Sequence, residues 1–85
     1  MTYFLYMLLD TNNKVSYVGY TKNLYKRISL HNSGKGAKFT RGRRWKLIYK
    51  EKCKSKPEAI KKEILLKKNR ILRKKIKSTY LVKKK

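Results

Sequence analysis

The chain has 85 residues, of which 26 are Lys or Arg and 4 are Asp or Glu, so its formal net charge is +22. One small domain fits this length, and so one-sided a charge opposes compaction unless a polyanion neutralises it, which makes nucleic acid the leading candidate partner. The composition excludes a membrane span, a two-metal nuclease site built from several carboxylates, and an internal disulfide or cysteine zinc site, because Cys53 is the only cysteine.

The longest apolar run, Tyr3 to Leu9, is a poor secretory signal as well, because no positive charge precedes it and Asp10 closes it. A lone cysteine favours a reducing compartment. We therefore expect a cytoplasmic protein with no signal peptide, no transmembrane segment and no membrane partner.

Residues 2–9 (TYFLYMLL) are apolar on both faces and too short for an amphipathic helix, which predicts a strand covered on both sides. Residues 10–13 (DTNN) are typical of a turn, and residues 14–20 (KVSYVGY) predict a second strand that completes an antiparallel hairpin. If the connecting loop has two or four residues, the residue numbers of two opposed positions add up to an odd number. Even positions of the first strand then share a face with odd positions of the second, so Tyr6, Tyr17 and Gly19 lie on one face. Because Gly19 has no side chain, we expect a hollow beside the two phenols.

A helix is predicted over residues 24–32, with Thr21 or Asn23 as its N-cap. At about 100° per residue, Leu24, Ile28 and His31 fall within one narrow sector of this helix, and Arg27 lies on its flank. The histidine and the arginine are therefore expected at the edge of the buried stripe. Taken alone, each has an ordinary structural interpretation, His31 as a core or capping residue and Arg27 as a surface base.

Residues 32–44 form a glycine-rich, basic loop or short helix. Its cationic side chains are candidate contacts for nucleic-acid phosphates: Lys35, Lys38, Arg41, Arg43 and Arg44. Phe39 and Trp45 are candidates for stacking on bases. Residues 45–49 (WKLIY) predict a third strand.

Ser55 and Glu58 match a capping box, with Pro57 in the first turn, so a helix should follow to about residue 68. Its inner stripe is expected to be Ile60, Ile64 and the stem of Lys67, with Glu63 beside that stripe. Asn69 could end this helix, and Ile71, Leu72 and Ile76 predict a shorter final one. We expect one domain over residues 1–77 and a basic, frayed tail over residues 78–85.

Only four carboxylates are present, and three have evident structural uses: Asp10 in the turn, Glu51 at the end of the third strand and Glu58 in the capping box. Glu63 remains. It can pair with Lys67 one helical turn away, or it can be a single ligand for a hard cation such as Mg²⁺, which prefers oxygen and keeps most of its waters.

The order of these pieces resembles the GIY-YIG nuclease domain. The match covers about residues 3–68 and consists of several elements in register: Phe4-Leu5-Tyr6, Tyr17-Val18-Gly19, Asn23 to His31, the run from His31 to Trp45, and Glu58 to Glu63. The first signature keeps only its tyrosine, and the second is a near match.

This resemblance implies an α+β fold, a small α/β sandwich with a three-stranded antiparallel sheet flanked by helices. It also implies a metal-dependent endonuclease mechanism. In that mechanism Tyr6 activates the attacking water, Tyr17 shapes the site and Arg27 neutralises the scissile phosphate. His31 orients a tyrosine or assists proton transfer, and Glu63 holds one divalent cation, Mg²⁺ or Mn²⁺.

The sequence therefore supports two hypotheses of different kinds. The first is a structure-specific or weakly sequence-specific DNA endonuclease in repair, recombination or processing of DNA, with RNA not excluded and specificity supplied by its own loops or by a protein partner. The second is a non-catalytic, basic nucleic-acid-binding module that retains the fold. An anionic-membrane binder that uses the terminal lysines is a weaker third hypothesis.

Overall fold

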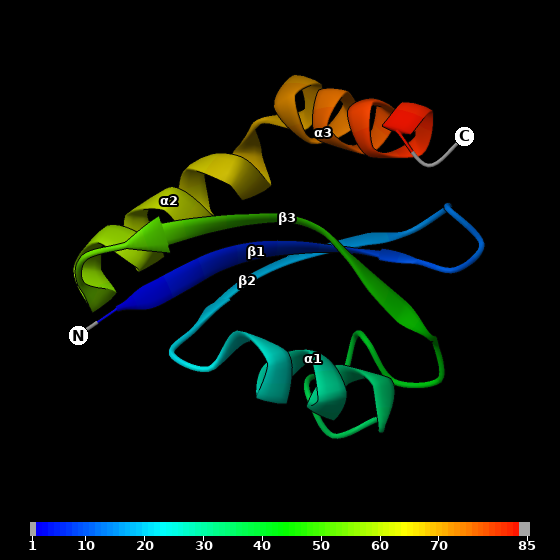
Figure 1. Cartoon of the computed structure of the whole chain (residues 1–85), viewed down its shortest axis with the longest axis horizontal. Helices are drawn as coiled ribbons and strands as arrows, with labels where there is room; N and C mark the ends of the chain where they lie inside the picture. The colour runs from blue at the N-terminus through cyan, green and yellow to red at the C-terminus, as the bar shows by residue number, and fades with distance from the viewer. Residues whose placement is uncertain (1, 84–85) are drawn as a thin grey trace.

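The computed structural model describes residues 2–83, which form a three-stranded antiparallel sheet and three helices. The elements in chain order are β1 (Tyr3–Asp10), β2 (Ser16–Thr21), α1 (Leu24–Asn32), β3 (Trp45–Cys53), α2 (Lys56–Lys68) and α3 (Arg70–Lys83). The strand order is β2-β1-β3, with α1 on one side of the sheet and α2 and α3 on the other (Figure 1). This arrangement confirms the expected α+β sandwich.

The hairpin register is the one that the parity argument predicts. Tyr6 lies opposite Gly19, and Leu8 lies opposite Tyr17, so the two tyrosines share a face. The Asp10 carboxylate closes the turn, accepting hydrogen bonds from the amides of Lys14 at 2.8 Å and Val15 at 2.9 Å. Burial alone would raise the pKa of Asp10, but these amides and the Arg43 guanidinium hold it below its ordinary value.

Each face of the sheet has its own core. The α2 face consists of buried Leu5, Met7, Val18, Cys53, Ala59 and Leu66. The α1 face consists of buried Tyr6, Leu8, Leu24 and Trp45, with Tyr17 and Ile28 partly buried against them. As the central strand, β1 supplies both cores by strict alternation, which explains why its residues are apolar on both faces.

A bulge in β3 determines which of its side chains reach which face. The pairing with β1 slips between Met7, which lies opposite Tyr49, and Leu8, which lies opposite Leu47. The extra residue changes the alternation, so Trp45 and Leu47 join the α1 face while Tyr49 and Cys53 join the α2 face. The strand also continues to Cys53, beyond the Tyr49 end that the sequence predicted.

Helix α2 has the predicted caps but a different inward face. Ser55 accepts a hydrogen bond from the Glu58 amide, and Asn69 is the C-cap, as expected. The buried residues are Ala59 and Leu66, however, and Ile64 is 45% exposed, so the predicted stripe of Ile60, Ile64 and Lys67 is wrong.

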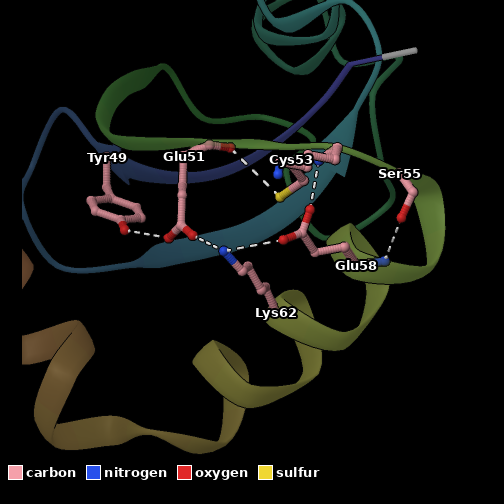
Figure 2. Close-up of polar contacts among 7 residues, drawn as sticks. Tyr49, Glu51, Cys53, Ser55, Glu58 and Lys62 are labelled. Carbon is pink, nitrogen blue, oxygen red and sulfur yellow. Dashed lines mark hydrogen bonds and ion pairs between the residues drawn. The ribbon is translucent and has the colours of Figure 1, made fainter.

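Polar contacts with β3 accompany this orientation of α2. Lys62 forms an ion pair with Glu51 of β3 and lies 3.8 Å from Glu58, and the Tyr49 hydroxyl donates to Glu51 at 2.7 Å (Figure 2). Since Lys62 must face the sheet to reach Glu51, Glu63 beside it turns inward too, and only 18% of the Glu63 side chain is exposed.

Helix α3 is longer than predicted. It runs from Arg70 to Lys83, so residues 78–83 are helical and not frayed; residues 84 and 85 of the expected tail lie outside the described residues. A half-buried stripe with helical spacing continues past the predicted end through Tyr80 and Leu81. The Lys46 ammonium lies over the Tyr80 ring at 5.6 Å, which connects this last part of the helix to β3.

Candidate active site

Two tyrosines and the only histidine meet on the α1 face. The rings of Tyr6 and Tyr17 are 6.4 Å apart, and the Tyr17 ring is 5.0 Å from the His31 ring. A hydrogen bond of 2.8 Å joins the Tyr6 hydroxyl to His31 Nε2. We expected a hollow above Gly19, and this prediction is wrong because the Tyr6 phenol fills the space. A Cβ on Gly19 would lie 2.5 Å from the Tyr6 hydroxyl.

Helix α1 positions His31 at its C-terminal end. Asn23 is the N-cap, accepting a hydrogen bond from the Lys26 amide, and Leu24 and His31 are the buried residues of the helix. The other ring nitrogen of His31, Nδ1, lies 2.8 Å from Thr40 Oγ1 in the following loop. His31 and Thr40 both have no exposed surface, so the imidazole is held on both sides by hydroxyl groups.

Burial keeps both partners of the Tyr6–His31 hydrogen bond uncharged. Desolvation raises the pKa of Tyr6 to about 12, although the nearby Arg27 opposes the rise. Desolvation, followed by repulsion from Arg27, lowers the pKa of His31 below its ordinary value. At neutral pH a neutral phenol therefore faces a neutral imidazole, which is the protonation state that a proton-transfer pair needs.

Arg27 lies one helical turn before His31 and carries an unsatisfied donor. Within the described part of the chain, its Nε is the one buried side-chain nitrogen or oxygen atom that has no hydrogen-bond partner. A buried polar group without a partner is costly, and such groups are often found where a ligand binds. A phosphate bound by the guanidinium would balance its positive charge.

Glu63 reaches toward the same region from α2. Its negative charge contributes to the raised pKa of Tyr6, although burial of the phenol is the main cause. Its carboxylate also lies 3.7 Å from Lys67 Nζ, so the ion pair weighed as its structural alternative is present. Residues 2–83 contain no cluster of three or more His, Cys, Asp or Glu side chains suited to a metal, so a cation here would have Glu63 and water as ligands, which Mg²⁺ accepts.

The basic loop presents its cations to solvent. Lys35, Lys38, Arg41, Arg43 and Arg44 are all exposed. Arg43 has a structural contact as well, since its guanidinium donates to the Asp10 carboxylate at 3.2 Å.

The two aromatic residues expected to stack on bases differ in accessibility. Trp45 is 4% exposed and its indole N–H donates to the Thr40 carbonyl at 2.9 Å, so the expectation that it stacks on a base is wrong. Phe39 is 59% exposed and stacks on Tyr17, with ring centroids 6.1 Å apart.

A hollow of about 280 Å³ opens beside Tyr17, at the edge of β2. The residues that line it are Ser16, Tyr17, Val18, Phe39, Lys67 and Arg73. Lys67 and Arg73 were not predicted to belong to the site, because they come from α2 and α3 and only the docking of those helices brings them to β2. Thr40 was also missed, since a threonine inside a basic loop carries no sequence signal of its partner.

The fold agrees with the nuclease family that the sequence motifs resemble. The chain belongs to the GIY-YIG family: the model of the GIY-YIG catalytic domain matches residues 2–77. The resemblance noted in the sequence motifs is thereby confirmed.

Relatives are small proteins from bacteria. The UPF0213 protein of Streptococcus pneumoniae serotype 4 is 45% identical over 64 residues, which cover 74% of this chain and 65% of that protein. UPF0213 protein SH2523 of Staphylococcus haemolyticus is 42% identical over 66 residues, which cover 76% of this chain and 79% of that protein. The chain thus spans slightly less than two thirds of the length of the pneumococcal relative.

A solved structure supports the fold. The solution NMR structure of the UPF0213 protein BH0048 from Bacillus halodurans is similar with a TM-score of 0.55 and 36% identity, over 93% of this chain and 85% of that one. None of the helices described between residues 2 and 83 has the length and hydropathy that a bilayer crossing requires.

Proposed function

We propose that this chain is a divalent-metal-dependent endonuclease that hydrolyses DNA phosphodiester bonds. The observation that supports this most strongly is the hydrogen bond between the Tyr6 hydroxyl and His31 Nε2, beside Tyr17 and the unsatisfied Nε of Arg27. A buried guanidinium nitrogen without a partner is uncommon in native structures and needs an explanation.

Tyr6 and His31 would activate the attacking water together. A phenol with a pKa of about 12 and its proton in place is a weak base on its own. As the water oxygen attacks phosphorus and the bond between phosphorus and the leaving oxygen breaks, the water proton passes to the Tyr6 oxygen while the Tyr6 proton passes to His31 Nε2. The result is a neutral phenol and an imidazolium, and positioned proton transfer of this kind typically contributes about 10²–10⁴-fold to rate.

The remaining residues would bind the substrate and stabilise charge. The Arg27 guanidinium would donate to a non-bridging oxygen of the scissile phosphate as negative charge grows there. Glu63 would hold the cation, which supplies Lewis-acid stabilisation of the leaving oxygen when bound. Phe39, Lys67 and Arg73 around the hollow beside Tyr17 would hold a flanking nucleotide by stacking and charge.

The binding surface favours recognition of DNA shape over sequence. The exposed loop cations Lys35, Lys38, Arg41 and Arg44 are suited to phosphates, which position a nucleic acid but carry no sequence information directly. Nicked or branched DNA is therefore the proposed preferred substrate, consistent with repair, recombination or processing of DNA. Specificity beyond shape would come from a protein partner.

Cleavage assays test this proposal. The protein is incubated with nicked, branched, duplex and single-stranded DNA, and with RNA of matched sequence, in Mg²⁺, Mn²⁺ or EDTA. We expect metal-dependent products from branched or nicked DNA, loss of those products for Glu63→Gln, and little product from RNA. Absence of products from every DNA substrate, or equal products with Glu63→Gln, would overturn it.

A non-catalytic binding module is the second candidate, and the exposed loop cations and Phe39 are the observations that favour it. Such a module would bind DNA with a steep dependence on salt, would cleave nothing, and would keep its affinity in Glu63→Gln. The same protein preparations, used in a gel-shift assay at several salt concentrations, distinguish the two candidates.

A further inference from the structure

The imidazole of His31 is held between two hydroxyl groups, and the position of its proton decides what Tyr6 can do. Tyr6 lies 2.8 Å from Nε2, and Thr40 Oγ1 lies 2.8 Å from Nδ1. If Nε2 carries the proton, it donates to the Tyr6 oxygen and cannot receive the Tyr6 proton. If Nδ1 carries the proton, Nε2 has a free lone pair directed at Tyr6.

The Ala37 carbonyl offers an acceptor for the hydroxyl proton of Thr40. Thr40 Oγ1 donates to the Ala37 carbonyl at 3.0 Å. A carbonyl can only accept, and a hydroxyl has a single proton, so Thr40 has no proton left for His31. With the hydroxyl proton directed at the Ala37 carbonyl, Nδ1 is the donor and Thr40 Oγ1 the acceptor of their hydrogen bond.

The loop backbone holds this arrangement in place. The Thr40 amide donates to the Ala37 carbonyl at 3.2 Å, and the Trp45 indole donates to the Thr40 carbonyl at 2.9 Å. A Cβ on Gly36 would collide with His31 Nδ1, so the backbone at Gly36 lies directly against the same edge of the ring. Thr40 is therefore a rigid neighbour of the imidazole, buried with it away from solvent.

We propose that Thr40 is a positioning residue that selects the Nδ1–H tautomer of His31, so that Nε2 accepts the hydrogen bond from Tyr6. The chain of donors runs from Tyr6 to His31 and from His31 through Thr40 to the Ala37 carbonyl. The consequence for cleavage rests on the proposed function, but the tautomer itself does not.

Nitrogen NMR tests the tautomer without any substrate. Because the chain has a single histidine, ¹⁵N-histidine labelling reports on His31 alone. At a pH where the ring is neutral, long-range ¹H–¹⁵N spectra distinguish the protonated nitrogen from the unprotonated one. We expect a protonated Nδ1 in the wild type and in Thr40→Ser, which keeps the hydroxyl.

Thr40→Val is the matched variant, since it keeps the shape of the side chain and removes the hydroxyl. A buried Nδ1–H would then lack an acceptor, so the ratio of the Nδ1–H to the Nε2–H tautomer should fall about tenfold or more. A wild-type ring protonated at Nε2, or an unchanged ratio in Thr40→Val with its fold intact, would overturn the proposal. If Thr40→Val fails to fold, the wild-type and Thr40→Ser spectra still decide the tautomer, and Thr40→Ala supplies the missing comparison.

Cleavage separates this inference from the proposed function. If both hold, Thr40→Val should lower kcat by about 10–100-fold with little change in DNA affinity, and Thr40→Ser should restore most of it. A selected tautomer in a protein that cleaves no DNA would support the role of Thr40 in the hydrogen-bond chain and remove only the nuclease proposal. Full activity in a Thr40→Val protein whose tautomer has changed would overturn the catalytic part of the inference.

Discussion

The two faces of one small sheet differ in chemistry although the same central strand builds both. The α2 face is a hydrophobic core of Leu5, Met7 and Val18 closed by Ala59 and Leu66. The α1 face holds Tyr6 against the fully buried polar residues His31 and Thr40. A domain of this length has little core to spare, so placing hydrogen-bonded polar groups on one face calls for an explanation other than stability.

One tyrosine on each face illustrates the difference between the two faces. Tyr6 on the α1 face and Tyr49 on the α2 face both have a pKa of about 12, raised chiefly by burial. Tyr49 donates to the Glu51 carboxylate, which is already paired with Lys62 (Figure 2), whereas Tyr6 bonds to an uncharged imidazole. Raised pKa values alone therefore do not identify a catalytic phenol; the partner that can take its proton does.

The largest expected effect is the loss of DNA cleavage on removing the Tyr6 hydroxyl, compared with removing that of Tyr49. Tyr6→Phe removes the proposed proton relay, so metal-dependent DNA cleavage should fall about 10²–10⁴-fold. Tyr49→Phe removes the hydroxyl of a partly buried tyrosine from the other face and should leave cleavage within about twofold of the wild type. Single-turnover assays on nicked or branched DNA measure both variants, and equal activity for the two would end the distinction between the faces.

The close contact at Gly19 gives the next largest effect. A Cβ there would lie 2.5 Å from the Tyr6 hydroxyl and 3.2 Å from Tyr17 Cε2, so Gly19→Ala should destabilise the fold by about 1–3 kcal/mol through overpacking. Urea unfolding measures the change. Ser16→Ala on the same strand is the control and should stay within about 0.5 kcal/mol. A stable Gly19→Ala protein would mean that Tyr6 is held less tightly than its contacts indicate.

The lowered pKa of His31 predicts a smaller, pH-dependent effect. Unfolding returns the ring to a pKa near 6.5, so below that pH the unfolded state binds more protons and stability falls as the pH drops. The loss should be at most about 1.4 kcal/mol per pH unit between pH 7.5 and 5.5. The pKa values of Asp10 and Glu51 are also lowered. Their contribution to stability is therefore lost only as the pH falls below their ordinary values of 3.8 and 4.5.

His31→Gln should abolish the dependence of the urea midpoint on pH in that window. A slope that persists in His31→Gln would show that another group titrates there and that the imidazole is not held neutral by its burial.

Local sequence rules predicted the elements and one shared face. Strand alternation in the hairpin predicted that Tyr6 and Tyr17 share a face, and the pairing of Tyr6 with Gly19 confirms it. Helical periodicity predicted that His31 lies toward the buried side of α1, and the buried imidazole confirms it. These inferences succeeded because strand alternation and helical pitch act over a few residues.

What the sequence did not predict depends on contacts between distant segments. The β3 bulge, which sends Trp45 and Tyr49 to opposite faces, has no glycine or proline to mark it. The orientation of α2 places Lys62 against Glu51 of β3, and the sequence offers many other lysines as partners for that acid. The catalytic roles of Tyr6, Tyr17, Arg27, His31 and Glu63 remain predictions, and Tyr6→Phe and Glu63→Gln test two of them directly.

The smallest expected effect concerns DNA binding by the basic loop, compared with the exposed surface of α2. Each of Lys38→Ala and Arg44→Ala should lower the slope of log affinity for DNA against log salt concentration by about 1, because each removes one phosphate contact. Lys61 is an exposed cation of α2, so Lys61→Ala is the matched control and should leave the slope unchanged. Arg43→Ala should lower the slope and also destabilise the hairpin turn, since it leaves Asp10 without its ion pair. Equal slopes for the loop variants and Lys61→Ala would mean that DNA contacts the whole cationic surface. The α1 face would then be the site of catalysis but not the main DNA-binding surface.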